Sequence, residues 1–353
     1  MSRSLTIDDT TITDDSDCYL IAEIGHNHQG SLEKCRELFR AAKECGADAV
    51  KLQKRDNRSL YTRAMYEKPY DNENSFGPTY GAHREALEFG REEYVELQRY
   101  AAELGITFFA TAFDVPSADF LAALDMPAYK LASGDLKNLP LLRHVARIGR
   151  PVIVSTGGAT LDDVHRAVDA IGELNPRIGI LQCTATYPTE PEQMNLRVIA
   201  SLREAFPTAC VGLSDHYNGI AMAVAAYVLG ARIIEKHFTL NHTWRGTDHA
   251  LSLEPVGMRK MIRDLRRARQ ALGDGVKRVL PGEEGAMTKM GKTLVAARDL
   301  PAGHLLTAAD IAVKSPGGGL PPYELDRLLG RRLSQALRAD DMIRFEHLLA
   351  SVA

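Results

Sequence analysis

The 353-residue sequence has little of what marks a membrane, secreted or nucleic-acid-binding protein. It contains no run of about 18 apolar residues, so we expect no segment that spans a bilayer. The first residues, MSRSLTIDDTTITDD, become acidic where a signal peptide would become apolar. The formal net charge is −3, and the sequence lacks the concentrated basic excess that nucleic acids or membrane surfaces require of a partner.

Cysteine is also scarce. The five cysteines are odd in number, scattered, and include no CxxC pair: Cys18, Cys35, Cys45, Cys183 and Cys210. This pattern excludes a disulfide framework and a zinc knuckle, and it predicts reduced thiols in a cytoplasmic protein.

Short β-rich apolar runs alternate with segments of helical periodicity, such as residues 32–45 and 92–104. The runs predict eight strands, at residues 19–25, 49–53, 107–113, 128–133, 152–156, 178–184, 209–215 and 231–239. Eight such units within about 240 residues favour a closed α/β barrel of the TIM, or (β/α)8, type. No GxGxxG follows the first strand, which disfavours a dinucleotide-binding sheet.

The composition changes near residues 272–288, where glycine and charged residues accumulate. We therefore expect the barrel in residues 1–275, a linker in 276–290 and a small C-terminal domain in 291–353. A domain of about 60 residues is only marginally stable alone, so we expect it to dock on something. The acidic insertion at 66–81 predicts a long loop over the mouth of the barrel.

Polar residues end nearly every predicted strand. Strands of a parallel barrel are apolar inside, and their C-terminal ends converge on one site, so these residues predict a single functional site. They are Glu23, Lys51, Gln53, Thr111, Lys130, Ser133, Ser155, Tyr187, Ser214, His216, Glu235 and His237.

His216 and His237 lie 21 residues apart, at the ends of successive predicted strands. Two neutral imidazoles with oxygen ligands suit a divalent ion such as Mn²⁺, Fe²⁺, Co²⁺ or Zn²⁺. The alternative is two histidines bonded to the backbone at the barrel rim. His26 and His28 are further candidate ligands, but their position beside Gly25 and Gly30 is more typical of a turn.

Lys51 and Lys130 lie within otherwise apolar strands. Two ammonium groups facing one pocket repel unless an anion lies between them, which predicts a phosphorylated or carboxylated substrate. The alternatives are a Schiff-base lysine and a pair of structural salt bridges to Glu23 and Asp135. The STGG loop at 155–158, before a predicted helix start at Thr160, can also offer backbone N–H groups to an anion.

Seven motifs resemble those of the sialic acid synthase (N-acylneuraminate synthase) family: IAEIGHNHQG, KLQKRD, KLASGD, STGG, CTATYPT, GLSDHYNG and EKHFTL, the last followed by GTDHALSLEP. The tail from Met287, MTKMGKTLVAARDLPAGHLLTAADI, resembles a SAF (antifreeze-like) domain. The resemblance implies a metal-dependent condensation of phosphoenolpyruvate with an open-chain amino-sugar aldehyde, N-acetylmannosamine or a related hexosamine. The products would be a nonulosonic acid and phosphate, formed by C–O cleavage. It also implies a domain-swapped homodimer.

The resemblance assigns a role to each site residue. His216 and His237 would bind the divalent metal, with Mn²⁺ expected and Mg²⁺ or Co²⁺ as alternatives. Glu23, Lys51, Lys130, Tyr187 and Asp248 would be catalytic. Phosphoenolpyruvate would be bound by Lys51, Gln53, Thr111, Lys130, Ser133, Ser155 and Ser214, and the sugar by Asp135, Tyr187, Asp248 and Ser315.

Three positions depart from the family pattern: Asp135 replaces Glu, Ala185 replaces Asn, and Ser315 replaces an Arg that contacts the N-acyl group of the sugar. Arginine to serine removes a charged donor with five N–H groups. A neutral or phosphorylated acceptor sugar therefore stays open, with Arg58, Arg245 and Lys314 as alternative donors. A Schiff-base aldolase is the alternative chemistry.

Overall fold

The chain folds as two compact units, Met1–Gly273 and Asp274–Ala353. The structure, a computed structural model, describes residues 3–350. Among these residues, no helix combines the length and the apolarity needed to cross a membrane.

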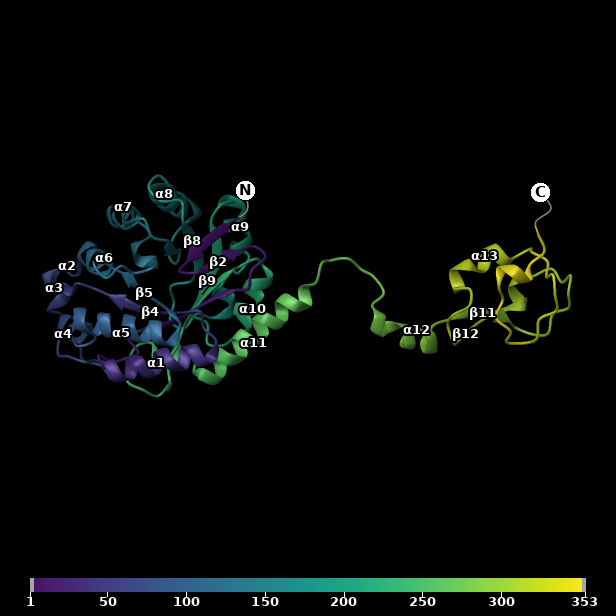
Figure 1. Ribbon diagram of the computed structural model, residues 1–353, viewed down its shortest axis with the longest axis horizontal. Helices are drawn as coiled ribbons and strands as arrows, with labels where there is room; N and C mark the ends of the chain where they lie inside the picture. Colours follow the sequence, from purple (N-terminus) through teal and green to yellow (C-terminus); the bar gives the residue numbers. More distant parts are fainter. Residues whose placement is uncertain (1–2, 351–353) are drawn as a thin grey trace. The chain divides into compact units, whose positions relative to one another are not determined.

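The first unit is a closed barrel of eight parallel strands surrounded by helices (Figure 1). The strands follow one another around the barrel in sequence order, and the last pairs with the first. They are β3 (Tyr19–Gly25), β4 (Ala49–Lys54), β5 (Thr107–Ala112), β6 (Tyr129–Leu131), β7 (Val152–Ser155), β8 (Ile178–Cys183), β9 (Cys210–Asp215) and β10 (Ile233–His237). The predicted TIM barrel is confirmed, and each predicted strand end lies within two residues of the observed one.

Eight helices of at least eight residues surround the described part of the barrel. They are α1 (Leu32–Cys45), α5 (Arg91–Leu104), α6 (Val115–Ala122), α7 (Leu139–Ile148), α8 (Leu161–Gly172), α9 (Val198–Ala205), α10 (Ala221–Val228) and α11 (Pro255–Leu272). The predicted helix start at Thr160 is confirmed, because its hydroxyl accepts a hydrogen bond from the Asp163 N–H (3.3 Å). The Asp163 carboxylate in turn accepts from the Thr160 N–H (3.0 Å), which completes a capping box.

An N-terminal hairpin closes the bottom of the barrel. Its strands, β1 (Ser4–Ile7) and β2 (Thr10–Thr13), pair antiparallel, and Leu5, Ile7 and Ile12 are buried in the same cluster as residues lining the barrel interior. This hairpin was not among the predicted strands, because the acidic residues of its turn, Asp8 and Asp9, dominate the composition of the segment. Because the hairpin fills the N-terminal end of the barrel, a site can form only at the C-terminal ends of the strands.

The acidic insertion is a loop over only part of its predicted length. Residues 67–79 connect two short helices, α3 (Arg63–Tyr66) and α4 (Tyr80–Glu85), so the ends of the predicted 66–81 loop are helical. Another short helix, α2 (Asn57–Leu60), follows β4. The Asn74 side chain accepts a hydrogen bond from the Gly246 N–H (2.9 Å), which places the loop at the C-terminal end of the barrel, as predicted.

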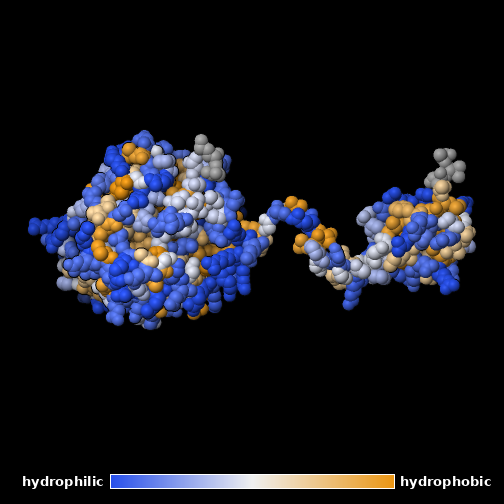
Figure 2. Space-filling model, viewed as in Figure 1, coloured by the Kyte–Doolittle hydropathy of each residue, from blue (hydrophilic) through white to orange (hydrophobic). Residues whose placement is uncertain are grey.

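The second unit has a small core of its own. The antiparallel strands β11 (Thr293–Ala296) and β12 (Ile311–Lys314), with the short helix α13 (Leu325–Leu328), surround a cluster of leucines that includes Leu294, Leu300 and Leu337. Residues 284–290, within the predicted linker, form α12 (Glu284–Met290). Apolar side chains are exposed along the segment that precedes the core, as Figure 2 shows; they are Val276, Val279, Leu280, Met287 and Met290.

Candidate active site

The polar residues at the strand ends line one cavity of about 510 Å³. It brings together nearly all of the residues that the sequence predicted for the site: Glu23, Lys51, Gln53, Thr111, Lys130, Ser133, Ser155, Tyr187, Ser214, His216, Glu235, His237 and Asp248. Parallel pairing of adjacent strands explains this convergence, since each strand delivers its C-terminal side chains to the same end of the barrel.

The two buried lysines are not left unpaired. Lys51 Nζ lies 2.5 Å from Glu23 Oε2 and 3.7 Å from Glu235 Oε2, and Lys130 Nζ lies 3.6 Å from Glu235 Oε1. Carboxylates therefore already separate the two lysines, as the salt-bridge alternative expects, and the predicted anionic substrate stays a prediction. The predicted salt bridge of Lys51 to Glu23 is present, whereas the carboxylate that lies beside Lys130 is Glu235 and not Asp135.

The two carboxylates have opposite pKa shifts. Burial raises the pKa of Glu23, and the charge of Lys51 only partly offsets this effect. Burial also opposes ionisation of Glu235, but Lys130 and Lys51 outweigh it and lower its pKa to about 2. Burial lowers the pKa of Lys130. Glu23 is therefore the carboxylate that can exchange a proton most readily.

Hydroxyl groups hold the lysines in place. Lys51 Nζ donates to Thr111 Oγ1 and Lys130 Nζ to Ser155 Oγ, both at 2.6 Å. Ser214 Oγ donates to Glu235 Oε1 at 3.1 Å. Each charged group of this cluster thus has a neutral partner that fixes its position.

Two glycines, Gly157 and Gly25, allow the backbone to lie close to side chains of the site. Ser133 Oγ accepts from the Gly157 N–H (3.0 Å), and a Cβ at Gly157 would lie only 2.8 Å from that oxygen. Gly25 ends β3 with a φ of +54°, where a Cβ would crowd Glu23 and Gln53 at 3.2 and 3.1 Å. Gln53 Nε2 donates to Glu23 Oε1 at 2.8 Å.

His216 and His237 face the cavity with ring centroids 5.5 Å apart. His216 Nδ1 lies 2.9 Å from the Thr184 carbonyl and so carries the proton, which leaves Nε2 with its lone pair. Among the described residues, His237 Nδ1 is buried without a hydrogen-bond partner, and Asp248 Oδ2 lies 3.9 Å from it. Burial lowers the pKa of both imidazoles, that of His216 to about 4, so both are neutral near pH 7.

These two histidines fit a divalent metal. Neutral imidazoles with free lone pairs are good ligands for Mn²⁺ or Co²⁺, and no hydrogen bond within residues 3–350 occupies Nδ1 of His237. Within residues 3–350 no group of three or more histidine, cysteine, aspartate or glutamate side chains is arranged to hold a metal ion. Water and substrate would have to supply the other ligands.

Tyr187 covers the histidine pair, with its ring stacked on that of His216 at a centroid distance of 4.0 Å. His26 and His28 do not join this pair. His26 lies between Arg55 and Arg84, and His28 stacks on Phe89. Both have the structural role that their loop position favours.

Two predicted sugar-binding residues are outside the lining of the cavity. Asp135 follows Ser133 and Gly134 at the rim, and burial raises its pKa to about 6. Ser315 belongs to the second unit, where its hydroxyl accepts from Lys292 Nζ at 2.5 Å. Their roles stay predictions.

Arg55 and Arg84 line the cavity, although neither is among the site residues predicted from the sequence. Arg55 lies two positions beyond Gln53, and this spacing along the strand-end loop is the signal that points to it. Arg84 lies on α4, just after the 66–81 insertion, where no periodicity marks it. Two arginines suggested as donors, Arg58 and Arg245, instead pack over Tyr66 and Phe76.

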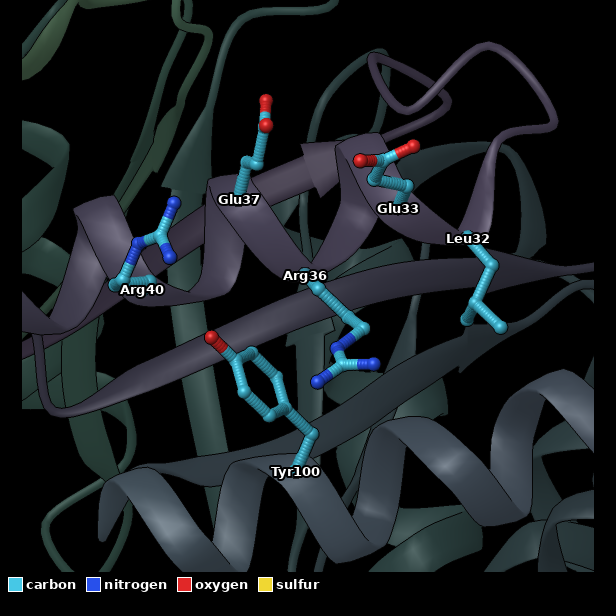
Figure 3. Close-up of a pocket in the computed structure, with 6 residues that line it drawn as sticks. All are labelled: Leu32, Glu33, Arg36, Glu37, Arg40 and Tyr100. Carbon is cyan, nitrogen blue, oxygen red and sulfur yellow. The ribbon is translucent and has the colours of Figure 1, made fainter.

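A second hollow of about 530 Å³ lies between α1 and α5, as Figure 3 shows. Arg36 points toward the Tyr100 ring, 4.4 Å from its centroid, and pairs with Glu96 at 3.2 Å. The lining comes from the surfaces of two helices and not from strand ends. The strand-end cavity is therefore the candidate active site.

Comparison with known proteins identifies the family to which this site belongs. The NeuB family model matches residues 38–277, and the SAF domain model matches residues 291–349. N-acetylneuraminate-9-phosphate synthase of Homo sapiens is 42% identical over 330 residues, which are 93% of this chain and 92% of that protein. N,N'-diacetyllegionaminic acid synthase of Legionella pneumophila is 35% identical over 339 residues, 94% of this chain and 95% of that protein.

A solved structure agrees with this assignment. The N-acetylneuraminic acid (sialic acid) synthetase of Leptospira borgpetersenii, in complex with citrate, superimposes with a TM-score of 0.71 at 30% identity. The match covers 81% of this chain and 95% of that one. With a confirmed barrel, a strand-end cavity and a matching C-terminal domain, the chain belongs to the NeuB family and carries a SAF domain.

Proposed function

We propose that the chain condenses phosphoenolpyruvate with an open-chain amino-sugar aldehyde, giving a nonulosonic acid and inorganic phosphate. The observation that carries the proposal is the pair of buried lysines, held by Thr111 and Ser155, in the same cavity as the two histidines. Membership of a family whose named members are synthases of such acids supports it.

The lysine side of the cavity would bind phosphoenolpyruvate. Lys51 and Lys130 supply charge, and the hydroxyls of Thr111, Ser133, Ser155 and Ser214, with Gln53, supply hydrogen bonds to the phosphate and carboxylate. An anion with several charges must share the lysines with Glu23 and Glu235.

The carbon chemistry follows from the enol phosphate. Carbon C3 attacks the aldehyde carbon, the aldehyde oxygen takes up a proton, and positive charge develops at C2. Water adds to C2, and the phosphate leaves with the bridging oxygen as the C–O bond breaks. Glu23, whose pKa is raised by burial, would stabilise the charge at C2 and accept a proton of the attacking water.

His216 and His237 would hold a divalent metal, with Mn²⁺ as the expected ion. When bound, the metal supplies Lewis acidity that polarises the sugar aldehyde. Asp248, 3.9 Å from His237, would orient that imidazole.

The identity of the acceptor does not follow from the family. The human relative is named for a phosphorylated product and the Legionella relative for an unphosphorylated one. We propose that Tyr187 and Asp248 contact the sugar hydroxyls, with Asp135 at the rim and Ser315 of the SAF domain as further contacts. Ala185 and Ser315 remove two donors of the N-acetylmannosamine pattern, so a related hexosamine or a sugar phosphate fits this proposal equally.

We also propose a domain-swapped homodimer in the cytoplasm. The exposed apolar side chains at the start of the second unit support docking on another surface, because such surface is costly in water, and the family resemblance points to a second copy as that surface. The five cysteines are free and buried, as expected of a reducing compartment.

A phosphate-release assay tests the proposed reaction. Phosphoenolpyruvate is incubated with a panel of hexosamines, neutral hexoses and their 6-phosphates, with Mn²⁺ or with EDTA. We expect phosphate release that needs both an acceptor and the metal. Borohydride trapping of Lys130 with pyruvate, together with turnover that EDTA does not affect, would instead establish a Schiff-base aldolase.

A further inference from the structure

Arg55 and Arg84 form a second cationic group on the cavity wall that the proposed chemistry does not use. Arg55 is 7% exposed, and its guanidinium stacks on the Phe113 ring at 3.7 Å. Arg84 is half-buried, and its Nε and Nη2 contact Tyr80 Oη at 3.1 and 2.9 Å. Both side chains line the cavity.

His26 separates the two guanidiniums. Its Nε2 lies 3.3 Å from Arg55 Nη1, and its Nδ1 lies 3.2 Å from Arg84 Nη1. Burial and the two adjacent cations hold the pKa of His26 well below its usual range, so the ring is neutral. The neutral ring has one acceptor nitrogen, and because Nε2 also lies 3.4 Å from Glu88 Oε1, Nδ1 is the nitrogen that can accept from Arg84. His26 adds no charge to the group.

Few carboxylates balance this group. Glu88 Oε1 lies 4.0 Å from Arg55 Nη1, but Glu88 also pairs with Lys54 at 3.1 Å. Within residues 3–350, Arg84 has no carboxylate within 4.0 Å, although the charge of Asp248 reaches it from farther away. Removing a cation from water is costly unless a counter-charge is present, so the arrangement favours a bound anion.

The arginines are separate from the lysine pair. Arg55 Nη2 donates to Gln53 Oε1 at 2.7 Å, and Gln53 in turn donates to Glu23, the partner of Lys51. An anion on the arginines would therefore lie across Gln53 and Glu23 from one on the lysines. The cavity offers two anion positions and not one.

Asp248 connects the arginines with the histidines. Its Oδ2 is 3.9 Å from His237 Nδ1, and its charge also acts on Arg84. An extended acceptor with its aldehyde at the histidines would pass Asp248 before reaching Arg84. The arginines thus stand where the far end of the sugar chain would lie.

We propose that Arg55 and Arg84 bind a phosphate monoester carried by the acceptor sugar at the end remote from its aldehyde. Planar guanidinium forks match the oxygens of a phosphate and suit this role better than an ammonium group. The inference rests on the proposed function and narrows its acceptor to a sugar phosphate.

The test compares kcat/KM for N-acetylmannosamine and its 6-phosphate in the full-length wild type and in Arg84→Gln, with Mn²⁺ and saturating phosphoenolpyruvate. We expect the wild type to prefer the 6-phosphate by about 100-fold, and the variant to reduce this preference to less than about tenfold. KM for phosphoenolpyruvate should stay within about twofold of wild type, because its site is the lysine pair. Arg84→Lys should keep part of the preference, and Arg55→Gln should reduce it as Arg84→Gln does.

Arg63→Gln is the matched control. Arg63 lies on α3, just before the 66–81 insertion, is exposed and pairs with Glu67, so its removal should leave the preference unchanged. The circular dichroism spectrum of each variant is compared with that of the wild type to test whether the fold is retained.

Three outcomes would overturn the inference: no preference in the wild type, a preference that neither arginine variant reduces, or weaker product inhibition by inorganic phosphate in Arg84→Gln. The last would show that the arginines hold the released phosphate. If the wild type turns over a hexosamine without a phosphate, and the arginine variants show the same preference between the two acceptors as the wild type, this inference is contradicted but the proposed function is not. Absence of phosphate release with every acceptor contradicts the proposed function itself.

Discussion

Glu235 lies between Lys51 and Lys130 and changes how the anion site works. Before substrate binds, the two lysines already face two carboxylates in a buried cluster. An incoming trianion must share them or cause a carboxylate to take up a proton. Since the pKa of Glu23 is raised and that of Glu235 is lowered to about 2, a proton taken up on binding would go to Glu23. Glu23 would then have to pass this proton on, for example to the aldehyde oxygen, before it could accept one from the attacking water.

Replacement of one lysine tests this arrangement. Lys130→Met keeps the length of the side chain but removes the charge next to Ser155 and Glu235. We expect KM for phosphoenolpyruvate to rise about 100-fold, because a charge-assisted contact to the substrate is lost. Steady-state kinetics with varied phosphoenolpyruvate measure this, and an unchanged KM would remove Lys130 from the anion site.

The two histidines allow a second prediction at the residue scale. His216→Ala and His237→Ala should each abolish measurable Mn²⁺ binding in isothermal titration calorimetry, because a site with one imidazole is too weak. The circular dichroism spectrum should not change, since both rings face the cavity and not the core. Wild-type Mn²⁺ affinity in both variants would show that the metal, if it binds, lies elsewhere.

At the scale of elements, the strands could be predicted because apolar runs and helix-ending glycines mark their limits. Once the barrel was inferred, Lys51, Lys130, His216 and His237 followed from their strand-end positions. Arg84 did not, because α4 follows an insertion whose path depends on tertiary contacts such as that of Asn74 with Gly246. The salt-bridge partners of the buried lysines were harder still to predict. The residue types indicate that a buried lysine needs a carboxylate, but they do not indicate which carboxylate.

Asp310, 1% exposed, organises the loop before β12 and gives an element-scale prediction. Its carboxylate accepts from the Thr307 hydroxyl (2.6 Å) and N–H (3.0 Å), from His304 (3.0 Å) and from Arg298 (2.7 Å). These bonds, led by that of Thr307, hold the pKa of Asp310 below its usual 3.8. The ionised form is thus favoured by the fold, and its stabilisation is present above pH 3.8 and lost as the pH falls through the lower folded value.

We therefore expect Asp310→Asn to reduce the amide-exchange protection of β11 and β12 by about tenfold or more near neutral pH. The difference from the wild type should shrink as the pH falls below about 4. Protection in the barrel strands serves as the internal control. A difference that is independent of pH would show that the charge of Asp310 does not stabilise the loop.

At the scale of the whole molecule, the division into two units could be anticipated from the composition shift near residue 272, and the first unit ends at Gly273. The surface on which each unit docks could not be anticipated from composition. Exposed apolar residues such as Val279 and Met290 show that a surface needs covering, but they do not show what covers it.

A chain ending at Gly273 tests the proposed dimer. We expect it to be monomeric in light scattering and to bind phosphoenolpyruvate with wild-type affinity, because the lysine cluster lies entirely in the barrel. Use of the acceptor should be impaired, since Ser315 and its loop are gone. A dimeric truncated barrel with full activity would contradict the domain-swapped arrangement.

The central claim is that the barrel cavity joins phosphoenolpyruvate to an aldehyde with cleavage of the C–O bond. The most direct measurement uses phosphoenolpyruvate labelled with ¹⁸O at the bridging oxygen, followed by mass analysis of the phosphate released by the full-length protein with Mn²⁺ and a sugar phosphate. The account predicts that phosphate appears only with the acceptor and carries the label. Unlabelled phosphate, or release without an acceptor, would contradict it.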